Sequence, residues 1–303
     1  MRVMDAAATA QALDPARLAD EIDRLLVDPG VHVPDRLVQA LPGGGSLFVM
    51  PAHDERLAIV KLITFTPANV GTHRPSIQGD VVVFDVRTGG RVAMLDGPVV
   101  TARRTAAVTM VAARRLAPQP KGPALIVGAG VQGRAHLEAL ACVLGVREFV
   151  IASRSGRSAQ ALAEHAQALG LSASTITDPH EALDACPLVL TCTPASAVVL
   201  RGPVRDDAFV AAIGAFTPGM IELDPALTRS IAARGHIVLD TAHARHEAGD
   251  LLQAGIDLTS CHTLAQVVAG SLAPARPVRT PVLFKSCGWA GWDLAAGRCT
   301  VHV

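Results

Sequence analysis

The chain has 303 residues and a mass of 31.4 kDa; half of its residues are hydrophobic, 18% are charged, and the mean hydropathy is +0.35. This composition predicts a folded protein with a sizeable core in two modest domains, and it excludes a mostly disordered chain. A formal net charge of zero, 3% aromatic residues and no tyrosine supply neither a basic field nor stacking platforms, which argues against a nucleic-acid partner.

The sequence also indicates a compartment. Its six cysteines form no CxxC pair and lie in apolar stretches, which is typical of free, buried thiols in a reducing environment. Residues 1–24 carry acids at helical spacing and lack the basic-then-apolar order of a signal peptide. No apolar run reaches the roughly 18 residues that a membrane span needs. We therefore expect a cytoplasmic protein with no membrane partner.

The N-terminal part is predicted to combine helices with an antiparallel sheet. An amphipathic helix is expected over residues 14–27, because its aliphatic residues share one face and its acids the other. Short β-rich runs separated by Gly, Pro and Asp turns follow at 46–50, 57–64, 80–85 and 91–95, and then an alanine-rich helix at 101–116. The Pro- and Gly-containing run at 118–122 indicates a domain boundary.

From residue 123 the pattern changes to an alternation of strands and helices. The apolar strands are short and continuous, as a parallel sheet covered on both faces requires. This part is therefore predicted to be a doubly wound α/β domain. Its expected strands are 124–127, 148–152, 171–177, 188–192, 209–213 and 237–240, and its expected helices are 132–144, 157–169, 179–185, 225–234 and 245–254. A further strand at 282–284 and a helical segment near 292–296 follow.

A Gly-x-Gly-x-x-Gly motif joins the first of these strands to its helix. Gly128 permits the tight turn, Gly130 lets the backbone approach a pyrophosphate, and the helix N-terminus offers free N–H groups. A glycine-rich turn without a nucleotide is the alternative, which the strand-to-helix context disfavours. The motif therefore predicts a Rossmann dinucleotide site, with contacts from Gly128, Ala129, Gly130, Val131 and Gln132.

The end of the second strand predicts the type of dinucleotide. An acid there would hold the ribose 2′-hydroxyl of NAD, whereas an arginine accepts the 2′-phosphate of NADP. This chain has no acid at that position and carries Ser153, Arg154 and Arg157 instead, which favours NADPH, with NADH as an alternative. The other reading is that the arginines are solvated residues at a helix start. Thr193, after the strand at 188–192, is expected to be a further cofactor contact.

Three cations of the first domain are candidates for binding an anion. Arg36, Lys61 and Arg104 are each flanked by apolar sequence. A lysine within an apolar strand is costly to bury unless an anion meets it, and a substrate carboxylate would serve. Each residue alone is more typical of a surface or salt-bridged position, so the carboxylate site rests on all three together.

Two other kinds of site are not expected. His243, His246, Glu247 and Asp250 lie close in sequence, but one turn of mixed ligands without a cysteine is weak evidence for a metal. A serine hydrolase would need a Gly-x-Ser-x-Gly elbow between a strand and a helix, and the chain has none.

Several stretches, in this order, resemble the ornithine cyclodeaminase and mu-crystallin family. They are Met50-Pro51, the strand around Lys61 with Pro67-Ala68-Asn69, Asp85-Val86-Arg87-Thr88-Gly89, Leu95-Asp96-Gly97, Arg104-Thr105-Ala106-Ala107, Val127 to Gln132, His246-Glu247-Ala248-Gly249-Asp250 and Leu283-Phe284-Lys285-Ser286-Cys287-Gly288. Together they run along nearly the whole chain.

The resemblance implies a homodimer in which each chain has two domains. A substrate-binding and dimerisation domain of α+β type would comprise residues 1–117, completed by 282–303, and a Rossmann domain would comprise residues 118–281. The resemblance also implies that Arg36, Lys61 and Arg104 bind the substrate carboxylate, with Lys61 as the catalytic cation.

One departure from the family pattern points to a subfamily. The resemblance implies that cyclodeaminases carry a catalytic aspartate just before a Pro-Gly-x-x-Glu-Leu stretch, where this chain has Phe216. An apolar wall at Phe216 suits a cyclic imine without a charged side chain, and the Gly-Ala-Phe-Thr-Pro form is similar to that of the family's ketimine reductases.

We therefore expect an NAD(P)H-dependent reductase that converts Δ1-pyrroline-2-carboxylate to L-proline and Δ1-piperideine-2-carboxylate to L-pipecolate. The substrate would be clamped by the three cations, so positioning and charge placement would supply most of the catalysis. The alternatives are an ornithine cyclodeaminase, an alanine-type amino-acid dehydrogenase, and a non-catalytic, crystallin-like nucleotide-binding protein.

Overall fold

The computed structural model describes residues 1–69, 72, 74–194, 197–270 and 279–301, and its contacts divide the chain into two compact units. Unit 1 comprises Met1–Arg104 and Trp289–Val303, and unit 2 comprises Thr105–Gly288. The divisions expected from sequence, at 117/118 and 281/282, differ from these. The first division falls inside helix α3 (Gly97–Leu116), at a point without Pro or Gly. Proline and glycine indicate where a helix or strand ends, but they do not indicate where a continuous helix changes its packing partner.

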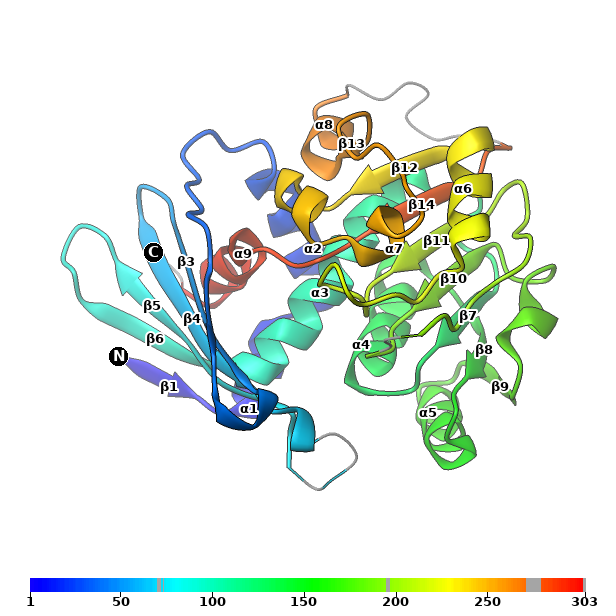
Figure 1. Ribbon diagram of the computed structural model, residues 1–303. Helices are drawn as coiled ribbons and strands as arrows, with labels where there is room; N and C mark the ends of the chain where they lie inside the picture. Colours follow the sequence, from blue (N-terminus) through cyan, green and yellow to red (C-terminus); the bar gives the residue numbers. More distant parts are fainter. Residues whose placement is uncertain (70–71, 73, 195–196, 271–278, 302–303) are drawn as a thin grey trace. The chain divides into compact units, whose positions relative to one another are not determined.

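Unit 1 contains a six-stranded sheet (Figure 1). Its strands are β1 (Arg2–Met4), β2 (Leu37–Ala40), β3 (Ser46–His53), β4 (Leu57–Phe65), β5 (Ile77–Asp85) and β6 (Arg91–Asp96). The order is β1-β6-β5-β4-β3-β2, and all pairs are antiparallel except β1 with β6. The four longer strands confirm the predicted runs. The short, mostly exposed β1 and β2 show no alternation of buried and exposed residues, so the sequence pattern missed them.

Helices cover one side of this sheet. They include α1 (Ala6–Ala12), α2 (Pro15–Leu25) and α9 (Ala290–Thr300). The short turn η1 (Pro42–Gly44) connects β2 to β3, and η2 (Pro67–Asn69) follows β4. The predicted first helix is α2: the Asp14 side chain caps it by accepting from the N–H groups of Ala16 and Arg17, and Leu18 and Ile22 are buried. The C-terminal helix α9 packs against α2, β3 and β4.

Close packing sets the register of α9 on the sheet. A Cβ added to Gly297 would lie 3.2 Å from Ile59 Cγ2 on β4, so glycine lets the helix approach this closely. Asp293 lies one helical turn before Gly297 on the same face, and Lys61 lies two residues after Ile59 on the same face of β4. This register brings Asp293 to Lys61.

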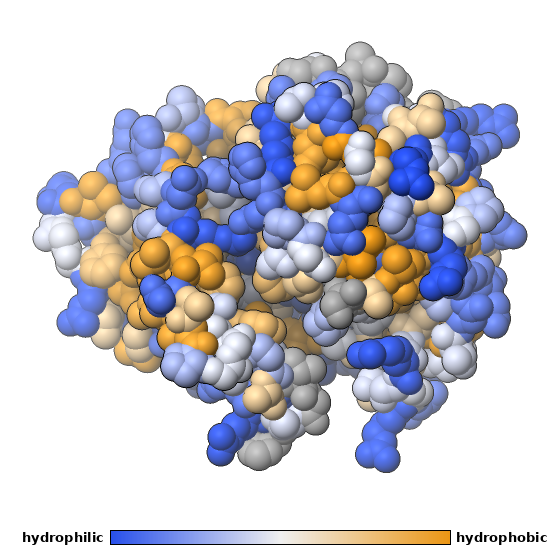
Figure 2. All heavy atoms as spheres, in the orientation of Figure 1, coloured by the Kyte–Doolittle hydropathy of each residue, from blue (hydrophilic) through white to orange (hydrophobic). Residues whose placement is uncertain are grey.

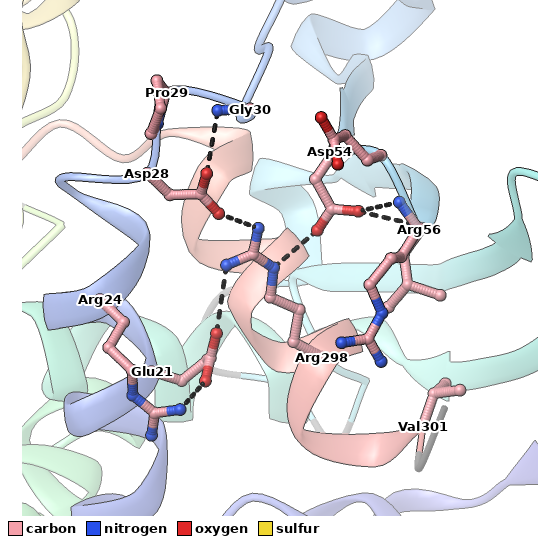
Figure 3. Close-up of a pocket in the computed structure, with 11 residues that line it drawn as sticks. Glu21, Arg24, Asp28, Pro29, Gly30, Asp54, Arg56, Arg298 and Val301 are labelled. Carbon is pink, nitrogen blue, oxygen red and sulfur yellow. Dashed lines mark hydrogen bonds and ion pairs between the residues drawn. The ribbon is translucent and has the colours of Figure 1, made fainter.

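A charged clamp at the end of α9 holds the same register (Figure 3). The Arg298 guanidinium donates to Asp28 Oδ2 at 2.7 Å, Asp54 Oδ2 at 2.7 Å and Glu21 Oε1 at 3.2 Å. These carboxylates come from α2, from the segment after it, and from the turn between β3 and β4. The hydrogen bond that Asp28 accepts from Arg298 holds the pKa of Asp28 below its ordinary value. One side chain thus ties three segments to α9.

Unit 2 contains an eight-stranded sheet in which neighbouring strands of the described residues are parallel, in the order β13-β12-β14-β11-β10-β7-β8-β9. The strands are β7 (Ala124–Val127), β8 (Glu148–Ala152), β9 (Ser172–Ile176), β10 (Leu188–Thr191), β11 (Phe209–Ala212), β12 (His236–Leu239), β13 (His262–Thr263) and β14 (Val282–Lys285). Strands β7, β10, β11 and β14 are buried at every position, as a doubly wound sheet requires. The predicted α/β fold is confirmed.

Strand β14 corrects one prediction. Residues 282–285 were expected to complete the first domain, but β14 pairs with β11 on one side and β12 on the other. Its four buried residues need sheet neighbours on both sides, so this strand belongs to unit 2. Only the segment from Trp289 onward returns to unit 1.

The helices of unit 2 connect these strands (Figure 1). They include the rest of α3, α4 (Val131–Ala139), α5 (Gly156–Ala168), α6 (Pro225–Arg234), α7 (Gly249–Leu252) and α8 (Leu264–Val268), with shorter turns η3 (Leu140–Leu144), η4 (Pro179–Ala182) and η5 (Ala242–His246). The helix expected at 132–144 ends in a π-turn, η3, and the one expected at 245–254 is split between η5 and α7.

Two further expectations concern cysteines and the membrane. All six cysteines are free, and five of them are buried, but Cys142 is exposed because it lies on the solvent side of η3. In the part of the chain that the structure describes, no helix has the length and apolar character to cross a membrane.

The clamp on α9 yields a stability prediction. The substitution Arg298→Met removes the cation that three carboxylates share, so we expect the free energy of unfolding of unit 1 to fall by about 2–4 kcal/mol. Both tryptophans of the chain, Trp289 and Trp292, lie in unit 1, so urea unfolding followed by tryptophan fluorescence reports on that unit.

Arg24→Met is the matched control, since the Arg24 side chain is 67% exposed in its ion pair with Glu21 and its loss should change stability by at most about 0.5 kcal/mol. Equal unfolding midpoints for the two variants would contradict the clamp.

Candidate functional site

The glycine-rich loop of unit 2 has the geometry of a dinucleotide site. Gly128 follows β7 with φ of 110°, in the region that favours glycine. A Cβ on Gly133 would lie 2.0 Å from Gly128 O, so this glycine allows α4 to pack against the loop. A Cβ on Gly130, the N-cap of α4, would meet nothing within 4 Å. The open side at Gly130 and the start of α4 therefore fit a pyrophosphate.

The residues predicted beside this loop lie around it. Val131 is 71% exposed at the start of α4, and the backbone carbonyl of Gln132 accepts a hydrogen bond from His136 Nδ1 at 2.8 Å. Thr193 follows β10, and a Cβ on Gly128 would lie 3.0 Å from Thr193 Cγ2. The structure thus places Thr193 beside the glycine-rich loop.

The residues predicted to select the cofactor follow β8. Ser155 caps α5 by accepting from the Ser158 N–H at 3.3 Å, so the chain turns sharply there. Arg154 and Arg157 are exposed on either side of this cap, and Ser153 is half-buried. Because β8 is the neighbour of β7 in the sheet, these residues follow the strand next to the glycine-rich loop.

A buried charged cluster lies in unit 1. Lys61, in the middle of β4, is 1% exposed, Arg104 on α3 is 7% exposed, and Asp293 on α9 is 0% exposed. Lys61 Nζ donates to Asp293 Oδ1 at 3.1 Å, and Arg104 Nε lies 3.6 Å from the same oxygen. Arg36 stacks over the Phe48 ring at 5.9 Å and acts electrostatically on Lys61. The structure thus places the three predicted cations in one cluster.

The electrostatics of this cluster favour an anion. Two buried cations, Lys61 and Arg104, share the single carboxylate of Asp293, and the charge of half-buried Arg36 also acts on Lys61. Burial lowers the pKa of Lys61 to about 8; the charges of Arg104 and Arg36 act in the same direction, and Asp293 opposes them. Arg104 Nε and Asp293 Oδ2 are buried and have no hydrogen-bond partner among the described residues. A carboxylate could satisfy such a donor.

Sequence reasoning missed Asp293. The available signal was an acid inside the apolar helical segment Trp289 to Ala296, because a carboxylate is seldom buried without a partner. Its partner Lys61 lies 232 positions earlier in the chain, so spacing could not connect the two.

The other predicted residues occupy different surroundings. Phe216 is partly buried and packs against the hydrophobic core of unit 2. Asp250, weighed as a metal ligand, pairs with Lys285 at 2.7 Å. Within the described ranges, no three His, Cys, Asp or Glu side chains gather in a way that could hold a metal ion.

Comparisons with known proteins agree with this organisation. The model of the ornithine cyclodeaminase/mu-crystallin family matches residues 28–302. The chain is 38% identical to Δ1-pyrroline-2-carboxylate reductase 2 of Burkholderia ambifaria, over 97% of this chain and 93% of the relative. It is 36% identical to a Δ1-pyrroline-2-carboxylate/Δ1-piperideine-2-carboxylate reductase of Azospirillum brasilense, over 98% and 94%.

A solved structure is similar over nearly its whole length. The Δ1-pyrroline-2-carboxylate reductase of Thermococcus litoralis, in complex with NADH and L-proline, matches with a TM-score of 0.91 and 25% identity. The match covers 99% of this chain and 96% of that chain.

The cluster makes a prediction about the titration of Lys61. The chain has three lysines, so labelling of the lysine side chains for ¹³C NMR yields few resonances. We expect Lys61 to lose its proton with a pKa of about 8. In Asp293→Asn the pKa should fall further, because the carboxylate that raises it is gone.

The resonance of exposed Lys121 is the internal control and should not differ between the two proteins. An unchanged or higher Lys61 midpoint in Asp293→Asn would show that the pair does not control this lysine.

Proposed function

Because the chain belongs to the ornithine cyclodeaminase/mu-crystallin family, we propose that it is an NAD(P)H-dependent reductase of cyclic ketimines. Its substrates would be Δ1-pyrroline-2-carboxylate, reduced to L-proline, and Δ1-piperideine-2-carboxylate, reduced to L-pipecolate. The names of the two relatives and the ligands of the archaeal structure support this choice. The observation that carries it is the buried cation cluster around Lys61.

The residues of the cluster account for substrate binding. Arg36, Lys61 and Arg104 would bind the carboxylate, and Arg104 Nε, which is buried beside Asp293 without a hydrogen-bond partner, is the donor best prepared for it. Such preorganised donors act strongly where water is excluded. When bound, the nicotinamide would supply the hydride that adds to the C=N carbon.

Lys61 has a second proposed role, at the ring nitrogen. Reduction of the C=N bond places a hydride on carbon and a proton on nitrogen. Below about pH 8 Lys61 keeps its proton and could donate it or orient the proton already on the ring. Asp293 favours the protonated form and thereby extends the pH range in which Lys61 is a cation.

Phe216 bears on the choice between family activities. Cyclodeamination of ornithine would need a group to handle the side-chain amine, and Phe216 offers none. We propose that Phe216 forms an apolar wall for the ring of the substrate. The presence of all three cations argues against a nucleotide-binding protein without turnover. An amino-acid dehydrogenase would act on an open-chain keto acid, and a cyclic ketimine explains the apolar wall better than such a substrate.

The preferred cofactor is proposed to be NADPH. Ser153 and the exposed arginines Arg154 and Arg157 follow β8, where a 2′-phosphate would lie, and no acid there would repel it. The proposed contacts of the rest of the dinucleotide are the residues of the glycine-rich loop and Thr193.

The protein is proposed to be a homodimer that pairs through the uncovered face of the unit 1 sheet. Neighbouring strands place apolar side chains opposite one another there: Val49 opposite Leu62, and Val60, Val82 and Met94 in one row. Figure 2 shows apolar side chains gathered over this sheet. Leu62 is 47% exposed, and a patch of this kind is typical of a contact between subunits.

The free cysteines support a cytoplasmic location.

The activity is tested directly with purified protein. We expect NADPH to be oxidised with either cyclic imine, followed at the absorbance of the reduced nicotinamide, with a higher kcat/KM for NADPH than for NADH. Ornithine with NAD should release no ammonia. Ammonia from ornithine, without NADPH oxidation by the imines, would identify a cyclodeaminase instead.

In the same assay, Lys61→Met should lower kcat/KM about a thousandfold because it removes a buried cation from the carboxylate site. Dinucleotide affinity should not change. Lys121→Met is the control and should be as active as the unmodified protein, since Lys121 is exposed. Undiminished turnover by Lys61→Met would remove Lys61 from the mechanism.

The dimer is tested by sedimentation velocity. Leu62→Glu places a charge on the proposed interface and should shift the protein to monomers, because burying an unpaired carboxylate is costly. Leu169→Glu, at a leucine of unit 2 that is 50% exposed, should leave the dimer intact. A dimer that persists in Leu62→Glu would place the interface elsewhere.

A further inference from the structure

A chain of buried charged groups crosses unit 2 from β14 to the loop after β11. Lys285 and Asp250 are both 0% exposed, and Lys285 Nζ donates to Asp250 Oδ2 at 2.7 Å. Asp250 Oδ1 accepts the backbone N–H groups of Glu222 at 2.6 Å and Leu223 at 2.9 Å. The lysine therefore holds the aspartate, and the aspartate holds the backbone at Glu222.

The carboxylate of Glu222 joins two loops. Its Oε1 accepts the Thr193 N–H at 2.7 Å and the Thr193 hydroxyl at 2.8 Å. Its Oε2 accepts the N–H groups of Gly214 at 2.6 Å and Ala215 at 3.3 Å. Thr193 follows β10, and Gly214 follows β11. One buried carboxylate thus uses four hydrogen bonds to fix the chain after two adjacent parallel strands.

These loops also touch the glycine-rich loop. A Cβ on Gly214 would lie 1.7 Å from Thr193 O, so the two loops are in direct backbone contact. A Cβ on Gly128 would lie 2.8 Å from Cys192 O, so the glycine-rich loop packs against the same segment. The glycine-rich loop at Gly128 thus contacts the loop at Thr193, and that loop contacts the one at Gly214. Glu222 binds the loops at Thr193 and Gly214.

The charges of the network are held in place by one another. Burial raises the pKa of Glu222, while the Lys285 charge and the Thr193 N–H oppose that rise. For Lys285, burial alone would lower the pKa, but Asp250, Cys287 and Glu222 outweigh it, so the pKa lies above its ordinary value. Buried ion pairs contribute little net stability compared with apolar packing. Their value here lies in the geometry that they impose.

We propose that Glu222, held by Asp250 and Lys285, is a positioning residue for the nicotinamide half of the dinucleotide site. In a doubly wound sheet a dinucleotide spans the carboxyl ends of two sets of strands. The residues proposed to bind the adenosine half follow β7 and β8. The loops after β10 and β11 therefore remain for the nicotinamide half. The inference rests on the proposed use of a nicotinamide cofactor.

Two ligands separate this role from general support of the fold. NADH and ADP share the adenosine diphosphate portion, and only NADH carries the nicotinamide riboside. Glu222→Gln keeps the size of the side chain but replaces an accepting oxygen with an NH₂ group, which cannot accept the N–H groups of one loop. We expect NADH to bind about tenfold more weakly, with ADP affinity changed by less than about twofold.

The measurement is a fluorescence titration with NADH, and ADP affinity is obtained by displacement of NADH and checked by calorimetry. Asp224→Asn is the matched control, because Asp224 is a nearby acid that caps α6, and asparagine caps equally well. It should change neither affinity. If Glu222→Gln fails to fold, Asp250→Asn removes the carboxylate oxygen that binds Lys285 and should weaken NADH alone, by about threefold.

Equal weakening of NADH and ADP would overturn the proposal, since it would show general support of the fold. Unchanged NADH affinity in a folded variant would overturn it as well. Failure of the unmodified protein to bind NADH or NADPH would contradict the proposed function itself, and this outcome differs from either of the others.

Discussion

The ion pair between Lys61 and Asp293 is the constraint on which unit 1 depends. Both groups are withdrawn from water, and neither could be buried alone without a large loss of solvation energy. The two residues lie 232 positions apart in the chain, so the C-terminal helix α9 must return to strand β4. The contact of Gly297 with Ile59 and the clamp at Arg298 hold it there. The packing of α9 therefore serves the same end as the chemistry of the site.

Unit 2 depends on backbone geometry in the same way. The loops after β7, β10 and β11 come so close together that Gly128 and Gly214 leave no room for a Cβ. Such contact leaves backbone N–H groups needing acceptors, and Glu222 supplies them for two of the three loops. A carboxylate in that position needs its own support, which Asp250 and Lys285 provide. Stretches that showed only a family resemblance in the sequence thus acquire a physical role.

Sequence reasoning predicted most of what is local. The strand, turn and helix around Gly128 followed from neighbouring residues, and apolar continuity identified the buried parallel strands. The cations Lys61 and Arg104 were recognisable because their flanking residues are apolar. Asp293 and Arg298 could not be paired in advance, since their partners lie more than 200 positions away. Strand β14 was assigned to the wrong unit because an apolar run shows that a strand is buried but not which sheet it joins.

The two buried lysines show how environment assigns function to one residue type. Lys61 and Lys285 are almost equally buried, and each pairs with one aspartate. Burial lowers the pKa of Lys61 to about 8, and the charges of Arg104 and Arg36 act in the same direction, so the pKa is close to the range in which a proton can be exchanged. Burial would also lower the pKa of Lys285, but Asp250, Cys287 and Glu222 outweigh it, so the pKa rises and Lys285 keeps its charge at neutral pH. A permanent cation suits a residue that positions loops. A cation whose proton is held weakly, beside further cations that need an anion, suits a residue that meets the substrate.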